Sequence, residues 1–301
     1  MSKVILDTDI GTNPDDVIAY VLAIKSPEID LLGVTTVYGD TEIRGKIAQA
    51  ISELCHSHTI PIYQGIERPL LRKRKVYWTG LEEQLGNLSD SKSPLEEKQK
   101  HAVDFIIETI MTYPGEITLV PIGPLTNVAA AIIREPKIIE NVKEIVIMGG
   151  VTRLGSYRLS VETSEHNVTC DPEAASVVFS SGAPITMIGL DVTRQLMISK
   201  QLVEQFASGD STIVKKLSKM MLDFMDYKMR DYSYLCDPLA IAVLLDRSLI
   251  ETTRMHIDVL YEPQTDKGIT LGEIKEDGKV KVALEVDKER FFELISNRIF
   301  S

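Results

Sequence analysis

The chain has 301 residues, of which 44% are hydrophobic and 26% are charged, and its mean hydropathy is +0.01. This composition is typical of a folded globular protein and excludes the disordered and fibrous classes. The net charge of −11 argues against a nucleic-acid partner, because binding to phosphates needs a basic face. No segment approaches about 18 uninterrupted apolar residues, so we expect neither a membrane span nor a signal peptide.

Two smaller features of the composition fit this interpretation. The three cysteines lie far apart without a CxxC spacing, which predicts neither disulfides nor a zinc site and favours a cytoplasmic protein. The one basic cluster, residues 68–75 (RPLLRKRK), is predicted to be a solvated loop.

Short apolar runs rich in β-branched residues alternate with amphipathic segments, which is the pattern of a parallel sheet covered by helices on both faces. In chain order, strands are predicted at Val4–Leu6, Leu31–Val37, Ile117–Pro121, Glu144–Met148, Ile185–Ile188 and His256–Val259. Helices are predicted at Asp16–Lys25, Glu42–Cys55, Lys98–Tyr113, Pro124–Glu135, Pro172–Ser180, Lys200–Phe206, Ile213–Asp231 and Pro238–Asp246.

No repeat and no low-complexity linker divides the chain, so one α/β domain over residues 1–301 is expected. Around residues 258–286, short strand-like runs alternate with turn signals such as EPQTDKG and KEDGK. This alternation predicts a hairpin or an addition at the sheet edge rather than a second domain.

The segment VILDTDIGTNPDD, residues 4–16, carries the most chemical information. An apolar strand runs into four carboxylates, Asp7, Asp9, Asp15 and Asp16. Carboxylates this close repel one another unless a hard divalent cation with oxygen ligands compensates them. Helix capping would explain one or two of these acids, but not four. Ligands of parallel sheets bind at the carboxyl ends of strands, where these residues lie.

Further polar groups follow other predicted strands or open helices. Asp40 follows the strand LLGVTTVY, Glu165 and Asn167 stand in SEHNVTCDPEAA, and Asp237 stands in YLCDPLAIA. An Asp-Pro pair is by itself an ordinary helix start. Together, however, polar groups from distant strand ends can converge on one pocket.

These residues stand in an ordered set of motifs that covers nearly the whole chain. The set comprises LDTDIGTNPDD, GVTTVYGD, PIGPLTNVAAA, IVIMGG, EHNVTCDPEAA, GLDVT, CDPLA and DKGIT. In this the chain resembles the inosine-uridine-preferring nucleoside hydrolases. The resemblance implies a single Rossmann-like α/β domain with an open, mixed and mostly parallel sheet, a bound calcium ion, and a homodimer or homotetramer. It also implies an enzyme of purine or pyrimidine salvage that cleaves the N-glycosidic bond of ribonucleosides with a calcium-bound water.

The resemblance also implies roles for individual residues. Metal ligands would be Asp9, Asp16, Asp237 and the main-chain carbonyl of Thr126. Asp15 would lie at the ribose 2′-hydroxyl, Asp40 beside the sugar, Met148 near the ring, and Glu165 and Asn167 at ribose hydroxyls. Asp9 would act as the general base on the bound water, and the surrounding carboxylates would stabilise the positive charge of the oxocarbenium-like transition state.

The chain departs from the family pattern at the leaving group. The residue before the metal-binding aspartate is often a histidine that protonates the departing base, but here it is Cys236, as in a subgroup of the family. Cys236 is expected to be either a proton relay or a wall of the pocket. Aromatic residues could instead contact the base. The candidates are Tyr77 and Trp78 of the early loop and Tyr227, Tyr232 and Tyr234 of the helical segment 221–234.

Two other functions compete with this one. DTD after a strand is also found in phosphatases of the haloacid dehalogenase type, although such an enzyme would not need the DD pair, EHN or CDPLA. Alternatively, the protein binds a nucleoside or ribose but has lost catalysis because Cys236 replaces the acid.

Overall fold

The strands form a nine-stranded sheet in the order β10-β9-β11-β6-β5-β4-β1-β2-β3, with a separate two-stranded sheet, β7-β8. This is seen in a computed structural model that describes residues 1–57, 60–71, 74–82, 100–157, 160–262 and 268–300. The strands are β1 Ser2–Thr8, β2 Ile29–Thr36, β3 Ile62–Gln64, β4 Ile117–Pro121, β5 Glu144–Met148, β6 Ile185–Ile188, β7 Met197–Ser199, β8 Tyr232–Tyr234, β9 Ile250–Tyr261, β10 Gly268–Ile274 and β11 Val280–Val286.

Neighbouring strands from β3 to β11 pair in parallel, whereas β9 pairs antiparallel with both β11 and β10. The predicted fold class is therefore confirmed. The order β3-β2-β1-β4-β5-β6 is the strand order of Rossmann folds, in which the direction of the connections reverses between β1 and β4. A crevice forms outside the carboxyl ends of the strands at such a reversal, so this is where a ligand site is expected.

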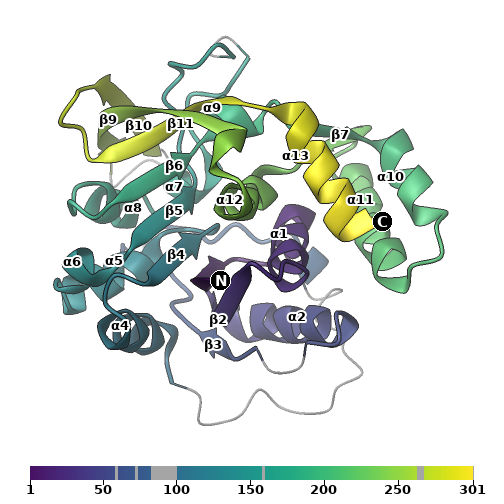
Figure 1. Ribbon diagram of the computed structural model, residues 1–301, viewed down its shortest axis with the longest axis horizontal. Helices are drawn as coiled ribbons and strands as arrows, with labels where there is room; N and C mark the ends of the chain where they lie inside the picture. Colours follow the sequence, from purple (N-terminus) through teal and green to yellow (C-terminus); the bar gives the residue numbers. More distant parts are fainter. Residues whose placement is uncertain (58–59, 72–73, 83–99, 158–159, 263–267, 301) are drawn as a thin grey trace.

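Helices cover both faces of the sheet, as Figure 1 shows. Along β1, the side chains of Val4 and Leu6 join one apolar core, whereas Ile5 joins the other, because successive side chains of a strand point to opposite faces. The helices are α1 Pro14–Ile24, α2 Thr41–Leu54, α4 Ala102–Thr112, α5 Thr126–Arg134, α6 Ile138–Asn141, α7 His166–Cys170, α8 Pro172–Phe179, α9 Leu190–Thr193, α10 Lys200–Ala207, α11 Thr212–Tyr227, α12 Cys236–Leu245 and α13 Lys288–Ile295.

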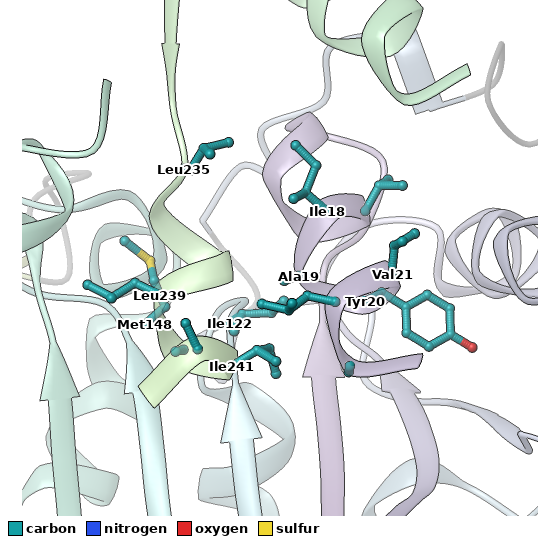
Figure 2. Packing of buried hydrophobic residues seen from close by; sticks show 14 of the residues in the cluster. Ile18, Ala19, Tyr20, Val21, Ile122, Met148, Leu235, Leu239 and Ile241 are labelled. Atoms are coloured by element: carbon teal, nitrogen blue, oxygen red, sulfur yellow. The ribbon is translucent and has the colours of Figure 1, made fainter. Parts of the chain in front are cut away.

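Helices α1 and α12 pack side by side against the same face of the sheet, although more than 200 residues separate them in sequence. Figure 2 shows Ile18 of α1 and Leu239 and Ile241 of α12 on the two sides of Ile122, with Met148 beside them. All five side chains are almost completely buried. This packing places the first turns of the two helices next to each other, and both first turns carry aspartates.

One predicted helix is too long. The apolar spacing predicts a helix to Asp231, but α11 ends at Tyr227 and Met229 has a left-handed backbone with φ of 51°. The chain then continues as β8, which pairs with β7. Tyr232 therefore lies on a strand and not on the helical segment predicted for residues 221–234. The short elements β3, β7, α6, α7 and α9 and the C-terminal helix α13 were not predicted.

The basic cluster was predicted to be a solvated loop, but Arg74 within it is buried. Its guanidinium contacts both carboxylate oxygens of Glu173, with Nε to Oε2 at 2.9 Å and Nη2 to Oε1 at 2.8 Å. The two side chains are only 4% and 10% exposed. This ion pair attaches the loop to α8, and residues 72–73 lie outside the described part of the chain.

Replacing Arg74 with alanine should lower the free energy of unfolding by about 3 kcal/mol or more, because it leaves the Glu173 carboxylate buried without its partner. Denaturant unfolding followed by circular dichroism measures this change. The matched control is Lys46→Ala, which removes an exposed pair with Glu42 and should cost less than about 1 kcal/mol. Equal effects of the two substitutions would contradict the assignment of Arg74 as a structural residue.

Candidate active site

One cavity lies at the carboxyl ends of β1, β4 and β5, at the reversal of the strand order. Residues at the starts of α1, α7 and α12 also line this cavity. Of the predicted site residues, Asp9, Asp15, Asp16, Met148, Glu165, Asn167, Cys236 and Asp237 line this cavity.

Three carboxylates form a tight group in the cavity. Asp15 and Asp16 belong to the first turn of α1 and Asp237 to that of α12, and an oxygen of each lies within 4.8 Å of the others. Burial, together with the neighbouring negative charges, raises the pKa of Asp16 and of Asp237 well above the ordinary value. Burial likewise raises the pKa of Asp15, to about 6. A hard divalent cation fits this group, because it binds oxygen ligands and compensates the repulsion between the carboxylates.

Hydrogen bonds fix the orientation of two of these carboxylates. The hydroxyl of Thr8, at the end of β1, donates to Asp16 Oδ1 at 2.5 Å. The backbone N–H of Cys236 donates to Asp15 Oδ2 at 3.3 Å and so connects α12 to α1. The oxygens of the group are therefore held in place by the chain itself.

Asp9, which was predicted to be a metal ligand, lines the cavity but lies outside this tight group, in which Asp15 stands in its place. Burial raises the pKa of its carboxyl, and the positive charge of Arg44 opposes the rise. Arg44, a fully buried residue of α2, donates to the backbone carbonyls of Asp9, Ile10 and Tyr38. It also donates to the Thr12 hydroxyl at 3.1 Å. A single side chain thus holds the loop that carries the acids.

Gly123, directly after β4 and Ile122, leaves room for Asp9. A Cβ at this position would lie 2.8 Å from the backbone nitrogen of Asp9 and 2.9 Å from its Oδ1. Any side chain here would therefore push the carboxylate out of position. This contact explains the glycine in the motif PIGPLTN.

Glu165 and Asn167 form the opposite wall. Glu165 caps α7, and its carboxylate accepts backbone N–H groups from Gly150, Asn167 and Val168 at 2.8 to 3.0 Å. Burial still raises the pKa of Glu165. The side-chain amide of Asn167 donates to the carbonyl of Ile122 at 2.7 Å and to that of Met148 at 3.0 Å. Both side chains are therefore rigid hydrogen-bonding groups suited to hydroxyls of a ligand.

Cys236 and Arg194 form a further part of the wall. Burial raises the pKa of the Cys236 thiol to about 12, and the negative charge of Asp15 adds to the rise. A neutral thiol of this kind is a poor proton donor near neutral pH. Arg194, which follows α9, forms an ion pair with Glu162. Burial disfavours its charge, but this pair outweighs the effect and raises the pKa of Arg194.

The model of the family described as inosine-uridine preferring nucleoside hydrolase matches residues 4–293. The chain belongs to this family. It is 34% identical to the inosine-uridine preferring nucleoside hydrolase of Crithidia fasciculata, with 97% of this chain and 96% of that protein covered. It is 33% identical to the pyrimidine-specific ribonucleoside hydrolase RihB of Escherichia coli O9:H4 strain HS, with 97% and 95% covered.

Solved structures of nucleoside hydrolases have the same fold. A plant nucleoside hydrolase superposes with a TM-score of 0.85 at 30% identity and covers 100% of this chain and 99% of its own. The purine-preferring ribonucleoside hydrolase of Gardnerella vaginalis gives a TM-score of 0.85 at 31% identity, with 99% and 98% covered. The family resemblance in the motifs is thereby confirmed, and the protein is a nucleoside hydrolase.

The structure places four predicted substrate-binding residues outside the cavity of this nucleoside hydrolase. Asp40 caps α2, where its Oδ1 accepts the N–H of Ile43 at 2.9 Å, and it lines a separate recess together with Trp78. Trp78 covers the guanidinium of Arg44 at 5.0 Å. Tyr227 is 46% exposed and Tyr232 36% exposed. Helix capping accounts for the position of Asp40, and packing on Arg44 accounts for that of Trp78.

Thr126 is also outside the cavity, which corrects its expected role as a carbonyl ligand. It is the first residue of α5, so its carbonyl is directed into the helix, and its hydroxyl donates to Asp171 at 2.6 Å. Ile122, directly after β4, lines the cavity instead. The backbone group available at this strand end is therefore that of Ile122.

Sequence reasoning missed several lining residues. Ser164 and His166 flank Glu165, Leu190 and Arg194 belong to the segment GLDVTR, and Asn13 precedes the acidic pair. Asn13, His166 and Leu190 lie inside recognised motifs and Ser164 and Arg194 lie next to them, and this position was the available signal.

Replacing Thr8 with valine should weaken binding of a divalent cation by about tenfold, because Asp16 loses the hydroxyl that orients it. Calorimetric titration of the purified protein with Ca²⁺ measures the affinity. Thr36→Val is the matched control, since the Thr36 hydroxyl donates to the carbonyl of Thr41 away from the acids. Unchanged affinity in Thr8→Val would show that this hydrogen bond does not support the cation site.

Proposed function

We propose that this nucleoside hydrolase cleaves the N-glycosidic bond of ribonucleosides with the help of a calcium ion held by Asp15, Asp16 and Asp237. The observation that carries the proposal is the buried group of three carboxylates, whose oxygens converge and for which no ion pair is found among the described residues. The backbone carbonyl of Ile122 is our choice for a further ligand. When bound, the ion lowers the pKa of a water and positions it at the sugar.

Asp9 is the proposed general base. It lies in the cavity outside the carboxylate group, and Arg44 fixes its backbone. A carboxylate in this position can accept a proton from the attacking water as the water oxygen bonds to C1′ of the ribose. The glycosidic nitrogen leaves with the electron pair of the broken bond.

Glu165 and Asn167 are the proposed contacts to ribose hydroxyls, with Met148 beneath the ring. Asp15 was predicted at the 2′-hydroxyl, but its place in the carboxylate group favours the cation instead. The sugar gains positive charge in the transition state, and the carboxylates around it stabilise that charge. The backbone N–H groups that hold Glu165 keep it in place while the charge develops.

The phosphatase alternative does not fit the geometry. The nucleophile of that mechanism would be Asp7, the first aspartate of DTD, but Asp7 is fully buried. Its Oδ1 accepts hydrogen bonds from the Thr35 hydroxyl at 2.5 Å and the Asn127 amide at 2.8 Å. A substrate phosphate has no access to it.

The test is release of free ribose from inosine, guanosine, adenosine, uridine and cytidine, with and without a calcium chelator. The panel contains purines and pyrimidines because relatives of similar identity carry names of different base preference. We expect release that is lost on chelation and restored by Ca²⁺. Binding of nucleosides without any release would instead support an inactive binding protein.

Asp9→Asn should lower kcat by about a hundredfold or more, because the attacking water loses its base. The matched control is Asp40→Asn, which lies outside the cavity, keeps a good helix cap and should retain activity. Similar losses in both variants would refute the assignment of Asp9.

We also propose that the protein is cytoplasmic and assembles as a homodimer or homotetramer. Cys55, Cys170 and Cys236 are all free thiols, which fits a reducing compartment. Large apolar side chains, Leu260, Leu271 and Ile274, are 48% to 60% exposed on the hairpin of β9 and β10 and would be covered by a second copy. Among the described residues, no helix is long and apolar enough to cross a membrane. Light scattering of the protein eluted from a size-exclusion column measures its mass, which should be two or four times that of one chain.

A further inference from the structure

Arg194 is held rigidly at the wall of the catalytic cavity. Its Nε donates to Glu162 Oε2 at 3.0 Å, and its Nη2 donates to Oε1 of the same carboxylate. Its guanidinium also lies over the ring of Tyr234, 4.4 Å from the centroid. The side chain is 22% exposed. One edge and one face of the guanidinium are thus fixed by the protein.

The other edge of the guanidinium is available to a ligand. No hydrogen bond from Nη1 to another group is found in the described part of the chain, while Arg194 lines the cavity. An arginine keeps its charge at any physiological pH and presents its donors in a fixed plane. The cavity therefore contains a permanent cationic donor whose position is set before a substrate enters.

The leaving group needs such a donor. When the glycosidic bond breaks, the electron pair moves to the nucleobase, which is a poor leaving group unless its negative charge is stabilised. The carboxylates of the cavity are assigned to the cation, to the attacking water and to the ribose hydroxyls, so none of them is left for the base. The thiol of Cys236 is neutral, and the charge of Arg194 lies close enough to act on it electrostatically.

We propose that Arg194 is a catalytic residue that hydrogen-bonds the nucleobase and stabilises the negative charge of the departing base. In this step the bond from C1′ to the base nitrogen breaks and its electron pair goes to the base. The water oxygen bonds to C1′ and one water proton goes to Asp9, which returns it to solvent. The base takes its proton from solvent, so Arg194 supplies charge and keeps its own protons. This inference rests on the proposed function.

The test compares two ribosides in the wild-type protein and in Arg194→Met, both with Ca²⁺. Inosine has a poor leaving group, whereas 4-nitrophenyl β-D-ribofuranoside releases a stable phenolate that needs no help. We expect kcat for inosine to fall by about a hundredfold, as on removal of a preorganised donor. For the nitrophenyl riboside we expect a change of no more than about threefold. Arg194→Lys should retain part of the inosine activity, because lysine keeps the positive charge but lacks the planar N–H donors of the guanidinium.

Thermal unfolding and Ca²⁺ affinity of each variant check that the fold and the cation site are intact. Glu162→Gln is the matched second variant: it leaves the guanidinium in place but loosens it, so inosine turnover should fall less than in Arg194→Met. Equal loss with both ribosides, or no loss with inosine, would overturn the role of Arg194. Failure of the wild-type protein to cleave either riboside would refute the hydrolase mechanism itself and this inference with it.

Discussion

The repulsion among Asp15, Asp16 and Asp237 is the constraint on which the site depends. Three buried carboxylates with oxygens within 4.8 Å of one another destabilise the fold unless protons or a cation compensate their charge. The raised pKa of each carboxyl has burial as its main cause and the neighbouring charges as a further cause. A bound divalent cation would remove this penalty and, in the proposed mechanism, would also activate the attacking water.

The scaffold acts against this repulsion from several sides. The packing of α1 against α12 brings the two first turns together, and the strand reversal between β1 and β4 opens the crevice beneath them. Arg44 holds the loop after β1 through the backbone carbonyls of Asp9 and Ile10, while Thr8 orients Asp16. Aspartates at helix starts also benefit from the positive end of the helix dipole. The contacts of Arg44 and the packing of α12 join the motif LDTDIGTNPDD to distant elements, and the hydrogen bond of Thr8 lies within that motif.

Much of the fold and the acidic part of the site could be predicted from the sequence. The alternation of apolar runs predicts the parallel sheet, and acids directly after a strand must lie at its carboxyl end. The sequence did not predict which residue after β4 offers its backbone carbonyl to the cavity, because this depends on where α5 begins. Because α5 begins at Thr126, the carbonyl of Thr126 is directed into the helix, and Ile122 is the residue that lines the cavity.

The remaining errors have the same kind of cause. Helical spacing continues past Tyr227, but the left-handed backbone at Met229 ends the helix and moves Tyr232 to a strand. Trp78 was a candidate for the base, yet it packs on Arg44, a contact between a loop and a helix that no local pattern reveals. Arg74 belongs to a charged run, but its partner Glu173 lies 99 positions away. Long-range pairing of this sort is decided by tertiary structure alone.

The most direct measurement of the central claim is a Ca²⁺ titration of protein freed of metal by a chelator, followed by calorimetry and by the temperature of unfolding. The account predicts one tightly bound ion per chain and a rise in the temperature of unfolding, because the ion binds only the folded arrangement of the three carboxylates. Both effects should disappear in Asp237→Asn. Binding and stabilisation that persist in this variant, or the absence of any binding to the wild-type chain, would contradict it.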